Sequence, residues 1–202
     1  MQADTTNLLL AAVLGYLCGS IPFGLLLTRA AGLGDIRAIG SGNIGATNVL
    51  RTGNRWLAAA TLVLDALKAA LPVLVARYYW GENAAMIAGI GAFAGHCFPV
   101  WLGFKGGKGV AVMIGSLLAL SWLVGLIFCA VWLVIAFAQK MSSLAALTAA
   151  ATAPIFAYVF VDQWLAGTAA VMAILLFFQH RANLVRLMAG TEPRIGSEKK
   201  AP

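Results

Sequence analysis

The amino-acid sequence predicts an all-α integral membrane protein, and three observations lead to that prediction. Of the 202 residues, 61% are hydrophobic and only 10% are charged, and the mean hydropathy is +0.89. A soluble domain is about 45–50% apolar and about 25% charged, and a chain of this length cannot bury so much apolar surface in one core. Long uncharged runs recur, without the period-two alternation of a transmembrane barrel. Soluble, disordered, coiled-coil and disulfide-scaffold classes are therefore excluded.

The uncharged and nearly uncharged runs indicate where the helices cross the membrane. A helix needs about 20 residues to span a hydrocarbon core of about 30 Å. We therefore expect a single polytopic membrane domain over residues 1–202, with seven spans at about 8–28, 56–76, 84–102, 108–120, 122–139, 143–161 and 163–180.

The uncharged run from 110 to 139 decides between six spans and seven. As one straight helix it would be about 45 Å long and would overshoot the bilayer. As two short spans it brings most basic residues to one side, with the N-terminus periplasmic and the C-terminus cytoplasmic. The cytoplasmic side then holds Arg29, Arg37, Arg51, Arg55, Lys105, Lys108, Lys140, Arg181, Arg186, Arg194, Lys199 and Lys200, which are 12 of the 14 Lys and Arg. Six spans would leave six there, so the positive-inside rule favours seven.

The net charge of +7 and the three cysteines bear on whether the protein binds nucleic acid or a metal ion. In a soluble protein such an excess of basic residues would point to nucleic acid, but here it marks one side of the membrane, and no nucleic acid partner is expected. Cys18, Cys97 and Cys129 all lie in apolar runs without pairing or metal-ligand spacing. No metal site is predicted.

Two polar segments on the cytoplasmic side have the composition of anion sites. Ser41–Arg51 combines small residues with Ser, Asn and Thr and ends on an arginine. Phe104–Gly109 has three glycines and two lysines where a helix begins, so that N–H groups and the helix dipole could face a phosphate. The second segment is not a Walker A loop, because the leading spacing and the following Ser or Thr are missing.

A third polar segment follows the last span. His180, Asn183 and Arg186 are three residues apart and would share one face of a helix, and Gly190-Thr191-Glu192 comes next. Basic residues beside spans are usually topology anchors or contacts with anionic lipid, a reading that fits Arg29, Arg77, Lys199 and Lys200. Anchoring does not explain three basic segments rich in Gly or Asn on one side, so we expect an anion site.

Asp65 and Lys68 are the formal charges that lie clearly within a span. They are three residues apart and can pair, and unpaired burial would be costly. We expect an interhelical ion pair that orients the second span rather than a direct catalytic role. His96 lies nine residues before Lys105 and is either a core histidine satisfied by a neighbouring helix or a functional one.

The polar segments resemble the signature motifs of a known family. Residues 41–51, 104–110 and 180–192 are similar to the three motifs of the bacterial acyl-phosphate:glycerol-3-phosphate acyltransferases, the PlsY type. Shorter matches, in the family's order, are Gly19–Pro22, Leu64–Lys68 and Gly95–Pro99. The resemblance implies transfer of a fatty acyl group from acyl phosphate to the 1-hydroxyl of sn-glycerol-3-phosphate. The products would be lysophosphatidic acid and phosphate, in phospholipid biosynthesis.

The resemblance also implies a location, partners and site residues. It implies the bacterial cytoplasmic (inner) membrane, a site facing the cytoplasm and no cofactor. The partners would be both substrates, the lipid bilayer and, transiently, the soluble enzyme that makes acyl phosphate. The catalytic residues would be His180, Asn183 and Ser41, and the substrate- or phosphate-binding residues Asn43, Thr47, Asn48, Arg51, Lys105, Gly106, Gly107, Lys108 and Ser142.

Within this site we expect Lys105, Lys108 and the two glycine amides to bind one substrate phosphate, and the first segment to hold the other phosphate or the glycerol. Because acyl phosphate is already activated, the enzyme mainly positions and neutralises. The base is either His180 or the phosphate of the donor. A small anion or phosphate transporter is the alternative, but transporters usually bind near the midplane and have repeat symmetry, and no repeat is visible here.

Overall fold

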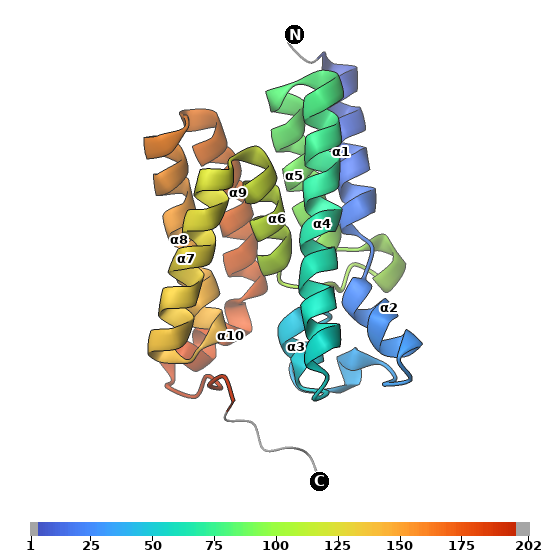
Figure 1. Cartoon of the computed structure of the whole chain (residues 1–202), viewed down its shortest axis with the longest axis vertical. Helices are drawn as coiled ribbons and strands as arrows, with labels where there is room; N and C mark the ends of the chain where they lie inside the picture. Colours follow the sequence, from blue (N-terminus) through green and yellow to red (C-terminus); the bar gives the residue numbers. More distant parts are fainter. Residues whose placement is uncertain (1–3, 197–202) are drawn as a thin grey trace. The chain divides into compact units, whose positions relative to one another are not determined.

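The computed structural model describes residues 4–196, and within that range the chain is helical with no strand (Figure 1). The predicted all-α class is therefore confirmed. In chain order the elements are α1 (Thr5–Gly19), α2 (Phe23–Ala30), η1 (Ile36–Ala38), α3 (Ala46–Leu50), α4 (Arg55–Trp80), α5 (Glu82–Cys97), η2 (Val100–Leu102), α6 (Val110–Leu120), α7 (Trp122–Gln139), α8 (Ser142–Phe160), α9 (Gln163–Gln179) and α10 (Arg181–Met188).

The helices divide into two compact units, Met1–Gly125 and Leu126–Pro202. The first unit contains the segments 41–51 and 104–109, and the second contains Ser142 and the segment from His180 onward. Helix α7 begins at the end of the first unit and continues into the second. This division describes how the helices pack and does not test the prediction of a single membrane domain.

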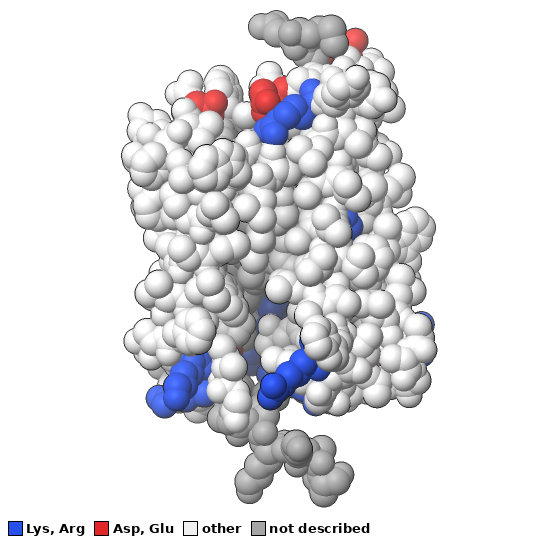
Figure 2. All heavy atoms as spheres, in the orientation of Figure 1, with Lys and Arg blue, Asp and Glu red and all other residues white. Residues whose placement is uncertain are grey.

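Five segments are long and apolar enough to cross a membrane: Thr5–Ala30, Arg55–Trp80, Glu82–Leu102, Trp122–Gln139 and Ser142–Phe160. The pair α9 and α10, bent by 66°, is a sixth candidate, whereas α6 has only 11 residues. In each unit the visible surface between the ends is largely free of charged side chains (Figure 2). Large apolar side chains of the candidate spans, such as Val63, Phe137 and Ile174, are exposed, as expected of a surface that contacts lipid.

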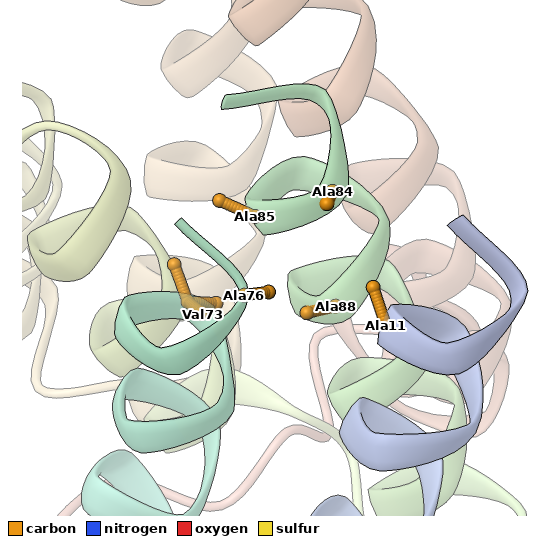
Figure 3. Close-up of a cluster of buried hydrophobic side chains, with 6 residues drawn as sticks. All are labelled: Ala11, Val73, Ala76, Ala84, Ala85 and Ala88. Carbon is orange, nitrogen blue, oxygen red and sulfur yellow. The ribbon is translucent and has the colours of Figure 1, made fainter. Parts of the chain in front are cut away.

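Small residues hold the first unit together. Figure 3 shows side chains of α1, α4 and α5 that meet in a fully buried cluster made of Ala11, Val73, Ala76, Ala84, Ala85 and Ala88. Because five of the six are alanines, the three helices approach closely. Small residues are usual at helix interfaces in membranes. Because lipid is as apolar as the side chains, no hydrophobic effect drives the helices together, and close van der Waals packing stabilises them instead.

Two glycines four residues apart lie on each of α1 and α5. They are Gly15 and Gly19 on α1, and Gly91 and Gly95 on α5. A Cβ at any of the four would collide with the backbone of the other helix. The two helices therefore pack backbone against backbone through reciprocal small-xxx-small patterns.

The predicted first span, 8–28, is not one continuous helix. Helix α1 ends at Gly19 and α2 begins at Phe23. Pro22 lacks a backbone N–H and disfavours the helical conformation at Ile21, so the helix breaks there. The carbonyl of Ile21 instead accepts a hydrogen bond from Lys68 Nζ at 2.6 Å.

Arg77 near the end of α4 does more than mark the membrane boundary. Its guanidinium donates to the backbone carbonyls of Ala119 and Leu120 and pairs with Glu82, with Nε and Oε1 2.7 Å apart. The last carbonyls of a helix have no partner within the helix. Arg77 therefore caps the C-terminal end of α6, a contact that its interpretation as an anchor did not include.

The second unit is built on α8 and α9. Helix α8 buries a series of alanines: Ala145, Ala146, Ala149, Ala150, Ala153 and Ala157. They bring α9 close, with Ala169, Met172 and Leu176 buried on it. Helix α10 then turns away from α9 by 66°, and His180 lies at the bend.

Candidate active site

The first polar segment folds around the buried side-chain amide of Asn48. Its Nδ2 donates to the backbone carbonyls of Ile36 at 2.9 Å, Ile39 at 3.1 Å and Asn43 at 2.8 Å. One side chain thereby holds three backbone carbonyls of the segment that runs from η1 to α3. Because buried carbonyls need partners, Asn48 is the centre of this segment's structure.

Ser41 and Arg51 converge on the other end of the same amide. Asn48 Oδ1 accepts from the Ser41 backbone N–H at 3.2 Å, from its hydroxyl at 3.4 Å, and from Arg51 Nη1 at 3.1 Å. The Arg51 side chain crosses Gly40, where φ is +56° and a Cβ would lie 2.6 Å from Nη1. The fold thus brings together three of the predicted site residues: Ser41, Asn48 and Arg51.

Asn43 and Thr47 complete the predicted residues of this segment. Asn43 Oδ1 accepts from the Gly45 backbone N–H at 2.8 Å, which makes a tight Asx turn before α3. Thr47 is exposed on α3. The hydroxyl of Thr47 is therefore open to a ligand from solution.

The second polar segment lies over the C-terminal end of α5. The Gly106 N–H donates to the carbonyl of Cys97 at 3.1 Å, and the Gly107 N–H donates to that of His96 at 2.9 Å. The expectation that these two N–H groups bind a phosphate is therefore wrong. They cap α5, whose last carbonyls would otherwise lack partners, and any other contact of the two glycines with substrate stays a prediction.

The glycines of this segment are required by packing on α5. A Cβ at Gly107 would overlap the His96 ring, and one at Gly109, where φ is +86°, would overlap Phe93. Helix α6 begins directly after Gly109 and has no side-chain cap. The N–H groups free to meet an anion are thus those of the first turn of α6, with Lys105 exposed and Lys108 half-buried before it.

Asp65 and Lys68 form the predicted ion pair, with Oδ1 and Nζ 2.6 Å apart and both side chains 2% exposed. The pair lies within α4, so it is not itself interhelical. The contacts to other helices come from Lys68, which also lies 3.0 Å from Nδ1 of His96 on α5. His96 is therefore buried and has its partner on a neighbouring helix.

In the second unit, His180 is buried at the bend between α9 and α10, so it does not share a continuous helix with Asn183 and Arg186. Its Nδ1 lies 2.9 Å from the carbonyl of Leu176. A carbonyl only accepts, so Nδ1 carries the proton, and in the neutral ring Nε2 has the lone pair. This is the arrangement that a general base or a hydroxyl acceptor needs.

Glu192 organises the third polar segment, and sequence reasoning gave it no role. Its Oε1 accepts from Asn183 Nδ2 and from Ser143 Oγ, each at 2.6 Å, and its Oε2 accepts from Arg186 Nε at 2.7 Å. Burial raises the pKa of the Glu192 carboxyl, but these three hydrogen bonds outweigh it and bring the pKa below its ordinary value. The signal that sequence reasoning passed over is that Glu192 is the one carboxylate within residues 180–192.

Ser142 begins α8 and is half-buried, whereas its neighbour Ser143 makes the contact with Glu192. The start of α8, the N-terminal half of α10 and the segment after α10 are therefore tied together. Within residues 4–196, no group of three His, Cys, Asp or Glu side chains is placed to hold a metal ion. The chemistry that these polar segments offer is anion binding, hydroxyl orientation and proton transfer.

Comparison with known families and curated proteins gives consistent matches along nearly the whole chain. The family model described as "Glycerol-3-phosphate acyltransferase" matches residues 9–190. A glycerol-3-phosphate acyltransferase of Mesorhizobium japonicum is 62% identical over 194 residues, which cover 96% of this chain and 99% of the relative. One from Methylorubrum populi is 61% identical over 198 residues and covers 98% of each chain.

Solved structures give the same match in three dimensions. One is PlsY (YgiH), an integral membrane glycerol 3-phosphate acyltransferase, in its glycerol 3-phosphate form, with a TM-score of 0.89 and 37% identity. The alignment covers 94% of this chain and 96% of that one. The lysophosphatidic acid form of PlsY has a TM-score of 0.87 and 36% identity, with the same coverage.

Proposed function

This chain belongs to the glycerol-3-phosphate acyltransferase family, and we propose that its acyl donor is an acyl phosphate and its acceptor the 1-hydroxyl of sn-glycerol-3-phosphate. It is an integral membrane acyltransferase of phospholipid biosynthesis. The observation that carries the proposal is the family match over residues 9–190, which contains the first two polar segments and nearly all of the third. Membership of this family replaces the transporter alternative.

The proposed reaction needs positioning more than activation. The acceptor hydroxyl oxygen attacks the acyl carbonyl carbon and forms the new ester bond, while the bond from that carbon to the donor phosphate breaks. The hydroxyl proton passes either to His180 Nε2 or to the departing phosphate. Since an acyl phosphate is a mixed anhydride with a good leaving group, holding the reactants and neutralising charge supplies most of the catalysis.

We assign one substrate phosphate to the segment Phe104–Gly109 and the first turn of α6. Lys105 and Lys108 provide positive charge, and the uncapped N–H groups of α6 provide donors with the favourable end of the helix dipole. Gly106 and Gly107 contribute by carrying the lysines over the end of α5, where a side chain would not fit.

We assign the other phosphate or the glycerol backbone to the segment Ser41–Arg51. Arg51 can bind a phosphate with two donors. Ser41 and Asn43 lie in the loop before α3, and Thr47 lies on α3. Asn48 acts through that loop, because its amide is occupied by loop carbonyls and by Ser41 and Arg51. Ser142 at the start of α8 is assigned a supporting contact with substrate.

In the second unit, His180 and Asn183 are proposed to orient the attacking hydroxyl. Asn183 is buried and its Nδ2 is held by Glu192 at 2.6 Å. His180 is fixed by Leu176 so that Nε2 is the accepting nitrogen. Both side chains are thus locked in orientation before substrate arrives, which is what a positioning mechanism requires.

The membrane arrangement is part of the same proposal. We propose seven spans in the bacterial cytoplasmic membrane, with the N-terminus periplasmic, the C-terminus cytoplasmic and the polar segments on the cytoplasmic side. The support is the distribution of Lys and Arg along the sequence. A cytoplasmic site would receive acyl phosphate from a soluble producing enzyme by transient contact.

The test uses purified protein, palmitoyl phosphate and labelled glycerol-3-phosphate, with lysophosphatidic acid and released phosphate both measured. We expect the two products in equal amounts. The matched arm replaces palmitoyl phosphate with palmitoyl-CoA and should give none. Product with the thioester alone would overturn the donor, and no product from either donor with folded protein would overturn the proposed reaction.

A further inference from the structure

Lys68 is the centre of a chain of buried polar contacts that joins α4, the break after α1 and α5 in the first unit. Its Nζ lies 2.6 Å from Asp65 Oδ1 on α4, 2.6 Å from the carbonyl of Ile21 at the break after α1, and 3.0 Å from His96 Nδ1 on α5. An ammonium group can only donate and has no acceptor. His96 Nδ1 therefore accepts, and the His96 proton lies on Nε2.

His96 carries this chain to the segment Phe104–Gly109. The Nε2 edge of its ring lies against Gly107, where the ring atoms are the nearest neighbours of an added Cβ. The His96 carbonyl also accepts the Gly107 N–H at 2.9 Å. One residue thus contacts the segment through both its ring and its backbone.

Stability alone is a weak reason for such a chain. A buried ion pair in a membrane span is costly, and replacing one by apolar residues is often neutral or stabilising. The broken first span explains one contact of Lys68, but it does not explain why the same ammonium fixes the tautomer and the ring position of His96.

We propose that Lys68 and His96 are positioning residues for the segment Phe104–Gly109, with Asp65 holding Lys68 in place. Lys68 fixes the His96 ring, the ring fixes Gly107, and Gly107 fixes the path that presents Lys105, Lys108 and the start of α6 to a substrate phosphate. This inference rests on the proposed role of that segment in binding phosphate.

The first experiment compares His96→Phe, which keeps a ring but loses both nitrogens, with His96→Asn, whose carbonyl oxygen replaces the Nδ1 acceptor. KM for each substrate and kcat are measured in the acyl phosphate assay. Lys105→Ala identifies the substrate that the segment binds, because it should raise the KM of that substrate. We expect His96→Phe to raise the same KM by about tenfold and to change kcat and the KM of the other substrate by less than about threefold. His96→Asn should show the same selective rise in KM, because it keeps an acceptor for Lys68 but has no ring to contact Gly107. Lys68→Met should behave as His96→Phe does.

A second experiment tests the contact between His96 and Gly107 directly. Gly107→Ala should raise the same KM, because its Cβ overlaps the ring. In a His96→Ala background the space is open, so adding Gly107→Ala should cause little further loss, a coupling that independent sites would not show. Ser116→Ala is the matched control, since it removes a fully buried hydroxyl of α6 that makes no hydrogen bond within residues 4–196. It should leave both KM values unchanged.

The outcomes separate this inference from the proposed function. If Lys105→Ala changes neither KM, the role of the segment in phosphate binding fails. If Lys105→Ala acts as expected but His96→Phe and Lys68→Met change both KM values alike, or kcat alone, the positioning role is rejected. If none of the His96 and Lys68 variants folds, the buried polar contacts around Lys68 serve folding, and the positioning role is also rejected.

Discussion

His180 shows how one backbone contact can define a side chain's chemistry. The carbonyl of Leu176 fixes the proton on Nδ1, and the bend after α9 places the residue where the helix no longer continues. The same carbonyl also accepts the backbone N–H of His180 at 3.0 Å, so Leu176 holds both the backbone and the ring of this residue. At the bend, the contact with Leu176 leaves Nε2 as the nitrogen that can accept a proton.

We expect His180→Ala to lower kcat by about 10²-fold or more, the usual contribution of a positioned base. His180→Gln is the matched variant, because its amide can place an acceptor near the Nε2 position and should keep the protein folded with partial orientation of the hydroxyl. Both are measured at saturating substrate in the acyl phosphate assay. Near-normal turnover of His180→Ala would assign the base to the donor phosphate.

Two asparagines have different tasks at the same scale. Asn48 directs its amide inward and closes the loop between η1 and α3. Asn183 lies in the first turn of α10, which begins directly after His180, and donates to one carboxylate oxygen of Glu192. An amide in a sequence motif is therefore not by itself a substrate contact, since the loop can use every donor and acceptor that it offers.

At the scale of elements, the α1–α5 pair depends on glycines that leave no room for a side chain. Gly19→Ala would place a Cβ against the backbone of Ala92, where nothing flexible can move aside. We expect a loss of about 1–3 kcal/mol in the free energy of unfolding, the usual cost of overpacking. Thermal unfolding in detergent measures it.

The matched control for Gly19→Ala is Gly167→Ala in α9, where an added Cβ meets nothing within 4 Å. There the higher helix propensity of alanine should stabilise the protein by up to about 1 kcal/mol in an exposed helix interior. Equal effects at the two glycines would contradict the backbone-to-backbone packing of α1 and α5.

The return of the chain after α10 depends on the charge of Glu192. Its pKa in the folded protein lies below the ordinary value of 4.5. The stability it contributes is therefore complete above that ordinary value and is lost as the pH falls through the lowered pKa. We expect Glu192→Gln to lower the unfolding temperature at pH 7 and to reduce its further fall in acid, which thermal scans from pH 7 to below 4 would record.

Glu82→Gln is the control for that experiment. Glu82 also pairs with an arginine, but its side chain is 61% exposed, and exposed pairs contribute about 0–1 kcal/mol. We expect little change at pH 7. An equal fall in unfolding temperature in the two variants would show that the hydrogen bonds of Glu192 stabilise the protein no more than an exposed ion pair does.

At the scale of the whole molecule, the distribution of charge along the sequence predicts the topology. A reporter fused at the C-terminus should read cytoplasmic, and one fused at Gly81, after Arg77, should read periplasmic, because 12 of the 14 basic residues then lie inside. A periplasmic C-terminus would reduce the count to six spans. The length of α6, 11 residues, makes this measurement decisive, since that helix is well short of the length of a span.

The sequence by itself determined the membrane class, the helical fold, the polar segments and the family. Those properties are local: hydropathy, glycine spacing and motif order are read without knowing which residues meet. Pro22 was also readable as a break in the first span, although the spans were assigned by hydropathy alone. The Asp65–Lys68 pair was predictable for the same reason, since three residues on one helix are neighbours by geometry.

Only the tertiary structure decided what each polar group does. It gave the N–H groups of Gly106 and Gly107 to the end of α5, the amide of Asn48 to its own loop, and three donors to Glu192. It also joined Lys68 to Ile21, 47 residues away, and to His96, 28 residues away. Buried polar groups must find partners wherever the fold brings them, and those partners lie too far apart in the chain for any local pattern to reveal.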